Sequence, residues 1–243
     1  MSEVTVTLAG RRRRQWPDGT LMSRLDKRTG AELLSLARGV RYREGAVLIR
    51  QGARDTRVYL LQQAESGVSA CAKVTACLDN GREALLGISV SGDVVGEQAV
   101  LGQRPRSATV VACSPLVAHP IPGLQFLDFL RRYPDAWQAV ALMITERLDW
   151  ADRRRLSFAG HDVRVHLARV IVELVDRHGY PDAGGYALGV SLSQAELGRL
   201  IGAGQDAAAI AVRQLREAGL VQTRYRGLVV RDLPGLRAAA GLK

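Results

Sequence analysis

The spacing of apolar positions changes twice along the chain, and these changes divide it into three stretches. From Tyr42 to about Ile121, apolar residues occur in short runs separated by Gly, Asp, Asn and Pro, which predicts β-strands. The runs are AVLIR, RVYLLQ, GVSACAKVTACL, EALLGIS, DVVG, SATVVAC and LVAHPI. Strands this short and evenly spaced predict an antiparallel β-roll or jelly roll. Asn80-Gly81 lies between two of the runs and predicts a hairpin.

Helical spacing returns at Leu124 and continues from Asp135 to about Phe158. A helix of about 24 residues is roughly 36 Å long, which is more than one small domain covers. We therefore expect this helix to pair with a second copy of the chain, with an ordinary core helix as the alternative. The predicted apolar face consists of Trp137, Val140, Ala141, Ile144, Leu148, Ala151 and Phe158.

The third stretch begins where Ala159-Gly160-His161-Asp162 interrupts the long helix. Asp162 can cap a new helix that ends at Gly179, and Ser193 with Glu196 has the spacing of a capping box at a later helix start. Residues 192–221 then predict two short helices joined by Gly202-Ala203-Gly204, a helix-turn-helix. The segment TRYRGLVVRD that follows predicts a basic two-stranded wing.

These patterns predict an α+β protein with an N-terminal double-stranded β-roll and a C-terminal winged helix-turn-helix. We expect a basic flexible arm over residues 1–20, the β-roll over 21–134, the dimerisation helix over 135–160 and the winged domain over 161–243. The arm carries Arg11, Arg12, Arg13 and Arg14.

The net positive charge of the chain favours a polyanionic partner. Lys and Arg number 34 against 24 Asp and Glu, for a formal charge of +10, as is common for proteins that bind DNA. No run reaches the roughly 18 apolar residues of a membrane span. The Arg run follows the first short segment instead of preceding an apolar one, unlike a signal peptide. We therefore expect a cytoplasmic protein that does not associate with membranes.

The three cysteines, Cys71, Cys77 and Cys113, match neither a CxxC pair nor a disulfide framework. We expect reduced thiols that pack in the core, with Cys71 and Cys77 on the same side of one strand. An iron-sulfur sensor would generally need four cysteines. A haem sensor stays open, although no His lies at an obvious ligand position. Motifs of metal or nucleophilic catalysis are missing, so an enzyme is not predicted.

Residues 93–109 carry the first candidate site. Gly96 allows a close backbone approach to a ligand, Glu97 can accept from a ribose hydroxyl, and Arg106 can bind a phosphate through two hydrogen bonds. This stretch resembles the phosphate-binding cassette of the cyclic-nucleotide-binding domain family, and residues 44–52 resemble the entry to that β-roll. The resemblance implies an effector site made of Gly96, Glu97, Arg106, Ser107 and Ala108, with a cyclic nucleotide as the candidate effector.

The cassette departs from the family at Gln98, where Leu is usual. The polar pair on the long helix that meets adenine in the cyclic-AMP receptor protein aligns with Ala151 and Asp152. Ala151 cannot bond a base and Asp152 offers only acceptors, which favours a base that donates. Both cAMP and cGMP therefore stay candidates.

From about Leu21 to Asp232 the architecture resembles the cyclic-AMP receptor and fumarate-nitrate reductase regulator (Crp/Fnr) family. The resemblance implies an effector-responsive transcriptional regulator that binds duplex DNA as a homodimer, with RNA polymerase as a further candidate partner. Family members usually begin the recognition helix with Ser-Arg-Glu, whereas this chain has Gln205 and Asp206, so a regulatory module without specific DNA binding is the alternative. The candidate DNA-binding residues are Ser193, Gln205, Asp206, Arg213, Arg224 and Arg226.

Overall fold

A computed structural model describes residues 16–64, 70–81, 83–160, 162–224 and 227–242, with the side chains of residues 157–160 left out. Most of the predicted N-terminal arm, and Arg226 in the predicted wing, lie outside the described residues.

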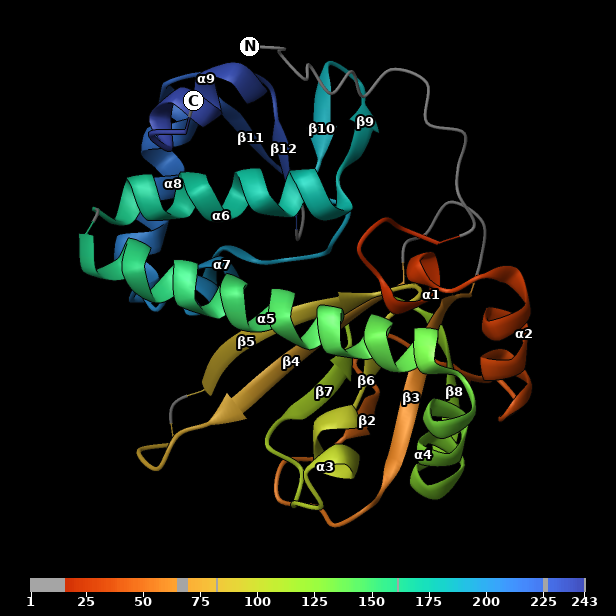
Figure 1. Ribbon diagram of the computed structural model, residues 1–243. Helices are drawn as coiled ribbons and strands as arrows, with labels where there is room; N and C mark the ends of the chain where they lie inside the picture. The colour runs from red at the N-terminus through yellow and green to blue at the C-terminus, as the bar shows by residue number, and fades with distance from the viewer. Residues whose placement is uncertain (1–15, 65–69, 82, 161, 225–226, 243) are drawn as a thin grey trace.

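The β-domain consists of two four-stranded antiparallel sheets packed face to face (Figure 1). One sheet has the order β1 (Val40–Tyr42), β8 (Leu116–Pro122), β3 (Arg57–Gln63) and β6 (Val94–Val95). The other has the order β2 (Val47–Ile49), β7 (Thr109–Ala112), β4 (Cys71–Cys77) and β5 (Glu83–Val90). The predicted antiparallel roll is therefore present, with every predicted run supplying a strand.

Both faces of β3 are buried, which explains why its sequence is apolar without alternation. Tyr59 and Leu61 join the cluster between the two sheets. Val58 and Leu60 belong to a second cluster with residues of the helices that cover the outer face of the sheet. These helices are α1 (Leu21–Arg24), α2 (Lys27–Ser35), α3 (Glu97–Leu101), α4 (Gly123–Arg132) and the start of the long helix α5 (Pro134–Gly160).

The predicted hairpin joins β4 to β5, but its turn is not centred on Asn80-Gly81. The Gly81 amide donates to the Leu78 carbonyl at 2.9 Å, so the turn begins at Leu78. Of the pair Asn80-Gly81, Gly81 is the residue with a positive φ, at +77°, a conformation that glycine adopts at little steric cost.

The expectation of reduced thiols is wrong for two of the three cysteines. Ala72 of β4 pairs with Ala112 of β7, and this register places Cys71 directly opposite Cys113 at the ends of the two strands. Their Cα atoms are 5.3 Å apart and the two residues form a disulfide. Cys77 is the exposed free thiol. The pair was missed because its partners lie 42 residues apart in the sequence and meet only through strand pairing.

The long helix α5 runs between the β-domain and the C-terminal domain (Figure 1). Its predicted apolar face divides into two. Val140 is buried with Ala136, Ala139 and Met143 against the β-domain, whereas Trp137 and Leu148 are 50% and 58% exposed. Phe158 lies in the helix, but its side chain is not described.

The C-terminal domain has the predicted winged helix-turn-helix topology. Asp162 caps α6 (Val163–His178), which is followed by β9 (Tyr180–Asp182) and β10 (Gly185–Ala187). The helix-turn-helix is α7 (Gln194–Ile201) and α8 (Gln205–Glu217), and β11 (Val221–Arg224) with β12 (Gly227–Val230) forms the wing. The predicted inward residues are all buried, namely Leu197, Leu200, Ile201, Ala208, Val212 and Leu215.

A last helix, α9 (Leu233–Ala239), was not predicted. Asp232 caps it, Pro234 stands in its first turn, and Leu236 is fully buried in the core of the domain. An Asp with a Pro two residues later is a recognisable helix-start signal, so the sequence did contain the information. Within the residues described, no helix combines the length and apolar character that a membrane span requires.

Candidate functional sites

The first candidate site lies where β6 meets α3. Gly96 separates the two elements with φ at +87°. A Cβ atom on Gly96 would lie 2.5 Å from Nη1 of Arg106 and 2.8 Å from Cδ1 of Ile49. Both the backbone conformation and the lack of space therefore require glycine.

Arg106 is the buried cation of this site, with 3% of its surface exposed. Its Nη1 donates to the Gly96 carbonyl at 2.8 Å. Its Nη2 donates to the Arg57 carbonyl at 2.5 Å and to the Asp55 carboxylate at 3.2 Å. Its Nε is buried and has no hydrogen-bond partner in the part of the chain that is described. A buried donor without a partner is costly, so this atom marks a position where an acceptor would be stabilised.

Glu97 is almost fully buried, and its carboxylate accepts from Nη1 of Arg147 at 2.7 Å. Nη2 of Arg147 also donates to the Val94 carbonyl at 2.9 Å. This pairing joins α5 to the start of α3. Burial raises the pKa of nearby Asp93, although the charge of Arg147 opposes that increase. The carboxylate expected to meet a ribose hydroxyl therefore faces a cation of the long helix in this structure.

The other three residues predicted for this site differ in exposure. Ser107 is exposed next to Arg106, and Ala108 is buried. Asp152 is exposed on α5 and pairs with Arg155 of the same helix at 3.5 Å. The structure thus brings together Gly96 and Arg106 through a hydrogen bond, while Asp152 faces a neighbour on its own helix.

Two residues that contact this site, Asp55 and Arg147, were missed from the sequence. Arg147 follows Met143 by four residues and precedes Trp150 by three, and both of those side chains are buried. A charged residue at helical spacing from two buried positions lies on the same side of the helix as they do. The sequence therefore already indicated that Arg147 has a buried partner. Asp55 lies in an irregular loop, where no periodicity indicates its direction.

The second candidate site is the helix-turn-helix. Ser193 caps α7, and the Glu196 carboxylate accepts from the Ser193 amide at 2.8 Å, completing the predicted capping box. Gly202 ends α7 with φ at +70°. The local sequence therefore fixes where α7 begins and ends.

The outer face of α8 carries the polar residues predicted to meet DNA. Gln205 and Asp206 are exposed in its first turn, and Arg213 lies exposed two turns later. A groove of about 250 Å³ runs between this face and the start of α7, lined by Gln194, Ala209, Ile210, Val212, Arg213 and Arg216. In the wing, Arg224 forms an ion pair with Asp182 of β9.

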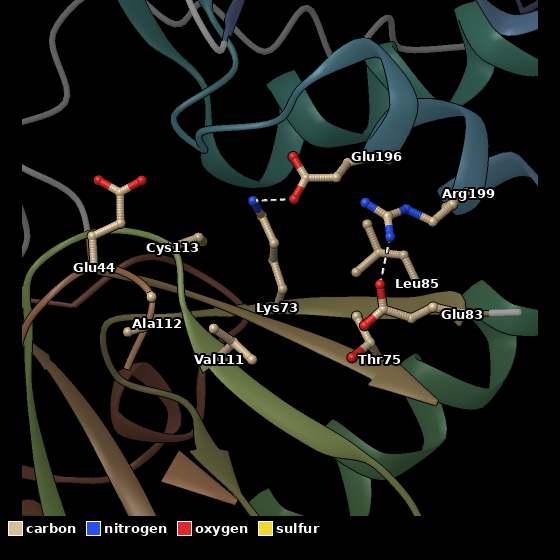
Figure 2. Close-up of a pocket in the computed structure, with 11 residues that line it drawn as sticks. Glu44, Lys73, Thr75, Glu83, Leu85, Val111, Ala112, Cys113, Glu196 and Arg199 are labelled. Carbon is tan, nitrogen blue, oxygen red and sulfur yellow. Dashed lines mark hydrogen bonds and ion pairs between the residues drawn. The ribbon is translucent and has the colours of Figure 1, made fainter. Parts of the chain in front are cut away.

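The two domains meet where α7 packs against β4 and β5, a region we call the interdomain contact (Figure 2). Lys73 of β4 reaches up to Glu196 of α7 at 2.5 Å, with only 11% and 15% of the two side chains exposed. Arg199 of α7 pairs with Glu83 of β5. Arg154 of α5 donates to carbonyls of both domains, those of Leu85 and Leu200.

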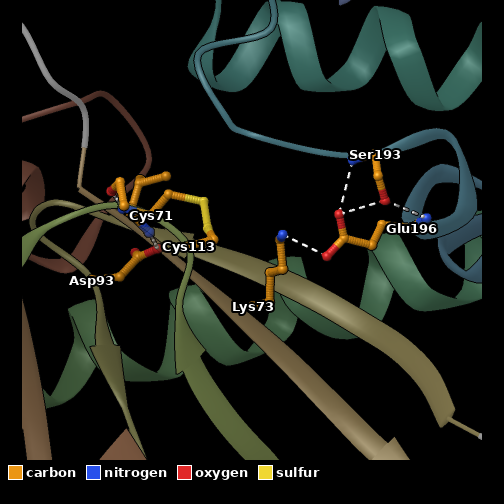
Figure 3. The surroundings of a disulfide bond; sticks show 8 residues. Cys71, Lys73, Asp93, Cys113, Ser193 and Glu196 are labelled. Carbon is orange, nitrogen blue, oxygen red and sulfur yellow. Dashed lines mark hydrogen bonds and ion pairs between the residues drawn. A yellow bond between two sulfur atoms is a disulfide. The ribbon is translucent and has the colours of Figure 1, made fainter. Parts of the chain in front are cut away.

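A cavity of about 190 Å³ lies within this contact, and Cys113 of the disulfide lines it. Figure 3 shows the disulfide beside Lys73, below the capped end of α7. Cys71, Cys113 and Leu85 belong to the same buried cluster as the core of the C-terminal domain. The disulfide is therefore part of the surface on which the helix-turn-helix packs. Among the described residues, no group of His, Cys, Asp and Glu is arranged to hold a metal ion.

Two protein families match the chain, one for each domain. The cyclic nucleotide-binding domain family matches residues 39–133. The Crp-like helix-turn-helix domain family matches residues 165–239. Together the two matches cover most of the sequence, and they fall on the β-domain and on the winged domain that the structure separates.

Several known proteins are similar to this chain over most of its length. The chain is 20% identical over 202 residues to the CRP-like cAMP-activated global transcriptional regulator of Mycobacterium tuberculosis, covering 83% of this chain and 88% of that protein. It is 26% identical over 158 residues to the cAMP-activated global transcriptional regulator Vfr of Pseudomonas aeruginosa, covering 63% and 72%. Its fold matches the c-di-GMP-responsive regulator CLP of Xanthomonas campestris with a TM-score of 0.70 at 21% identity, covering 85% and 100%.

Proposed function

The chain belongs to the Crp/Fnr family of DNA-binding transcriptional regulators, and on that premise we propose that it is a homodimer whose β-domain binds an anionic effector. A regulatory module that has lost DNA binding is not favoured, because the Crp-like helix-turn-helix match extends over both α7 and α8. Since DNA is its partner, we place the protein in the cytoplasm, with RNA polymerase as a candidate partner at the promoter.

The effector site that we propose centres on Arg106, with the Gly96 and Glu97 backbone, Ser107 and Ala108 around it. The support is the buried guanidinium of Arg106, whose Nε has no acceptor among the residues that the structure describes. A cyclic nucleotide is the effector class that we propose, because two relatives are named as cAMP-activated regulators. We include Asp152 in the proposed site as the residue that would meet the base; in this structure it is exposed and pairs with Arg155.

The DNA-binding surface that we propose consists of Ser193, Gln205, Asp206 and Arg213, with Arg224 and Arg226 of the wing. This proposal rests on the difference between the two faces of α8. Its inner residues are buried in the domain core, while Gln205, Asp206 and Arg213 point outward. In such motifs the N-terminal residues of the second helix contact base edges in the major groove, and a dimer meets half-sites about 34 Å apart.

Selection from random DNA duplexes tests this proposal, and we expect an enriched palindrome. Gln205 can bond adenine N6 and N7, so Gln205→Ala should relax one base preference, with about 1–3 kcal/mol lost at that position. Gln214→Ala, the same change near the far end of α8, is the control and should leave the motif unchanged.

Arg224→Ala should weaken binding to all DNA sequences equally and reduce the salt dependence of the affinity by about one phosphate contact. Failure to enrich any motif at low salt, with and without cAMP or cGMP, would contradict the proposal.

A further inference from the structure

We propose that Asp55 is a built-in competitor for the anion that the β-domain binds, and that it sets the affinity of the effector site. This inference rests on the proposed effector function and assigns a role to a residue outside the cassette. Oδ2 of Asp55 lies 3.2 Å from Nη2 of Arg106. The Asp55 carboxylate is therefore already the charge partner of Arg106, the cation that we propose holds the effector.

The loop of Asp55 is fixed to Arg106 through the backbone, so the ion pair follows from the fold. The Gly52 amide donates to the Arg106 carbonyl at 2.8 Å, and the Arg106 amide donates to the Ala53 carbonyl at 2.9 Å. Oδ1 of Asp55 accepts from the Arg57 amide at 3.1 Å, which orients the carboxylate. A change of the Asp55 side chain leaves both backbone hydrogen bonds in place.

The two residues differ in how readily they can leave the pair. The Arg106 side chain is only 1% exposed, whereas the Asp55 side chain is 40% exposed. Asp55 can turn into water, where a carboxylate is well solvated, but Arg106 cannot follow it. The pair therefore opens by movement of the carboxylate, which leaves a buried cation in need of an acceptor.

The donors of Arg106 indicate which chemical group replaces Asp55. Nε and Nη2 share one edge of the planar guanidinium, and that edge binds two oxygen atoms of one anion in parallel. Asp55 and the Arg57 carbonyl contact Nη2, while Nε has no partner among the described residues. A phosphodiester supplies two oxygen atoms with a single negative charge. It can replace Asp55 at Nη2 and also reach Nε, whereas a neutral nucleoside supplies no such charge.

Calorimetric titration with cAMP, cGMP and inorganic phosphate tests the proposal on the full-length protein. Asp55→Asn keeps an oxygen for the Arg57 amide and removes the competing charge. We expect this variant to bind the cyclic nucleotide about five- to tenfold more tightly than the unchanged protein. That factor is the free energy of a partly exposed ion pair converted to a ratio of affinities. Asp55→Glu keeps the charge and should stay within about twofold of the unchanged protein. Tighter binding of inorganic phosphate as well would identify the phosphate group as the recognised part.

Asp128→Asn is the matched control, because it removes an exposed carboxylate that pairs, within the described part of the chain, with exposed Arg131. It changes the net charge by the same amount and should leave the affinity unchanged. If Asp55→Asn does not fold, as judged by circular dichroism, Asp55→Ser replaces it with the same expected gain. Equal affinity in Asp55→Asn and the unchanged protein would overturn the competitor role while the effector site stands. No binding by either protein at millimolar nucleotide would overturn both, and the DNA selection would still judge DNA binding separately.

Discussion

Cys71 and Cys113 are the residues for which sequence and structure differ most directly. Residue spacing excluded the familiar cysteine motifs, yet strand register placed the two thiols opposite each other. Glu97 and Arg147 are a similar case, since 50 residues separate them. An apolar pattern reports which side of an element is buried, but it does not identify the partner across the interior. Arg106 was predicted because a motif resemblance carried it, whereas Asp55 had neither a motif nor a periodicity.

Loss of the disulfide should lower the free energy of unfolding by about 2–4 kcal/mol, because the bond closes a long loop. The loop spans 42 residues. Urea unfolding of the protein with and without a reductant measures the difference, with Cys71→Ser/Cys113→Ser compared in the same way. Cys77→Ser is the control, because that thiol is exposed and free. Thiol titration that found three free cysteines in protein purified without reductant would refute this prediction.

At the scale of elements, helix caps were the most dependable signals. Asp162, Ser193 and Gly202 each begin or end a helix as their local chemistry predicts. The long helix was predicted, but the single face assigned to it serves two purposes. Val140 packs on the β-domain of its own chain. The other positions, 137, 141, 144, 148 and 151, alternate in steps of four and three, the spacing of a coiled-coil seam. Of these, Ile144 also packs partly against the β-domain cluster.

The seam on α5 should hold the dimer together. Trp137→Lys/Leu148→Lys places two charges on it and should give a monomer, because burial of each apolar side chain contributes about 1.5–3 kcal/mol. Leu142→Lys/Leu156→Lys adds the same charge to exposed positions of α5 outside the seam and should remain dimeric. Sedimentation equilibrium at micromolar concentration distinguishes the two. A monomeric unchanged protein, or a dimeric seam variant, would argue against this interface.

The arrangement of the whole molecule is what the sequence predicted least. The sequence assigns the two domains to separate stretches, since each has its own periodicity and its own turn signals. Their packing against each other depends on Lys73 and Glu196, which are 123 residues apart. Glu196 had been assigned a single role as part of a capping box. In the structure its carboxylate also pairs with Lys73 of the β-domain, beside the Arg199–Glu83 pair, so one residue both caps α7 and joins it to the other domain.

Glu196 should therefore make the stability of the interdomain contact depend on pH. Burial by itself raises the pKa of Glu196, but hydrogen bonds from Lys73 and Ser193 outweigh it and lower the pKa below the usual 4.5. A carboxyl with a lowered pKa stabilises the folded state above its unfolded pKa, and this contribution is lost as the pH falls through the folded value.

Glu196→Gln retains the acceptor of the capping box and removes the ion pair. At pH 7 it should lower the free energy of unfolding by about 1 kcal/mol, and hydrogen exchange should become faster in α7 and β5 together. The difference from the unchanged protein should vanish at pH values below the folded pKa. Glu217→Gln is the control, since Glu217 is 64% exposed and lies 3.9 Å from Arg213. A stability difference that persists unchanged into acid would mean that the charge of Glu196 does not hold the two domains together.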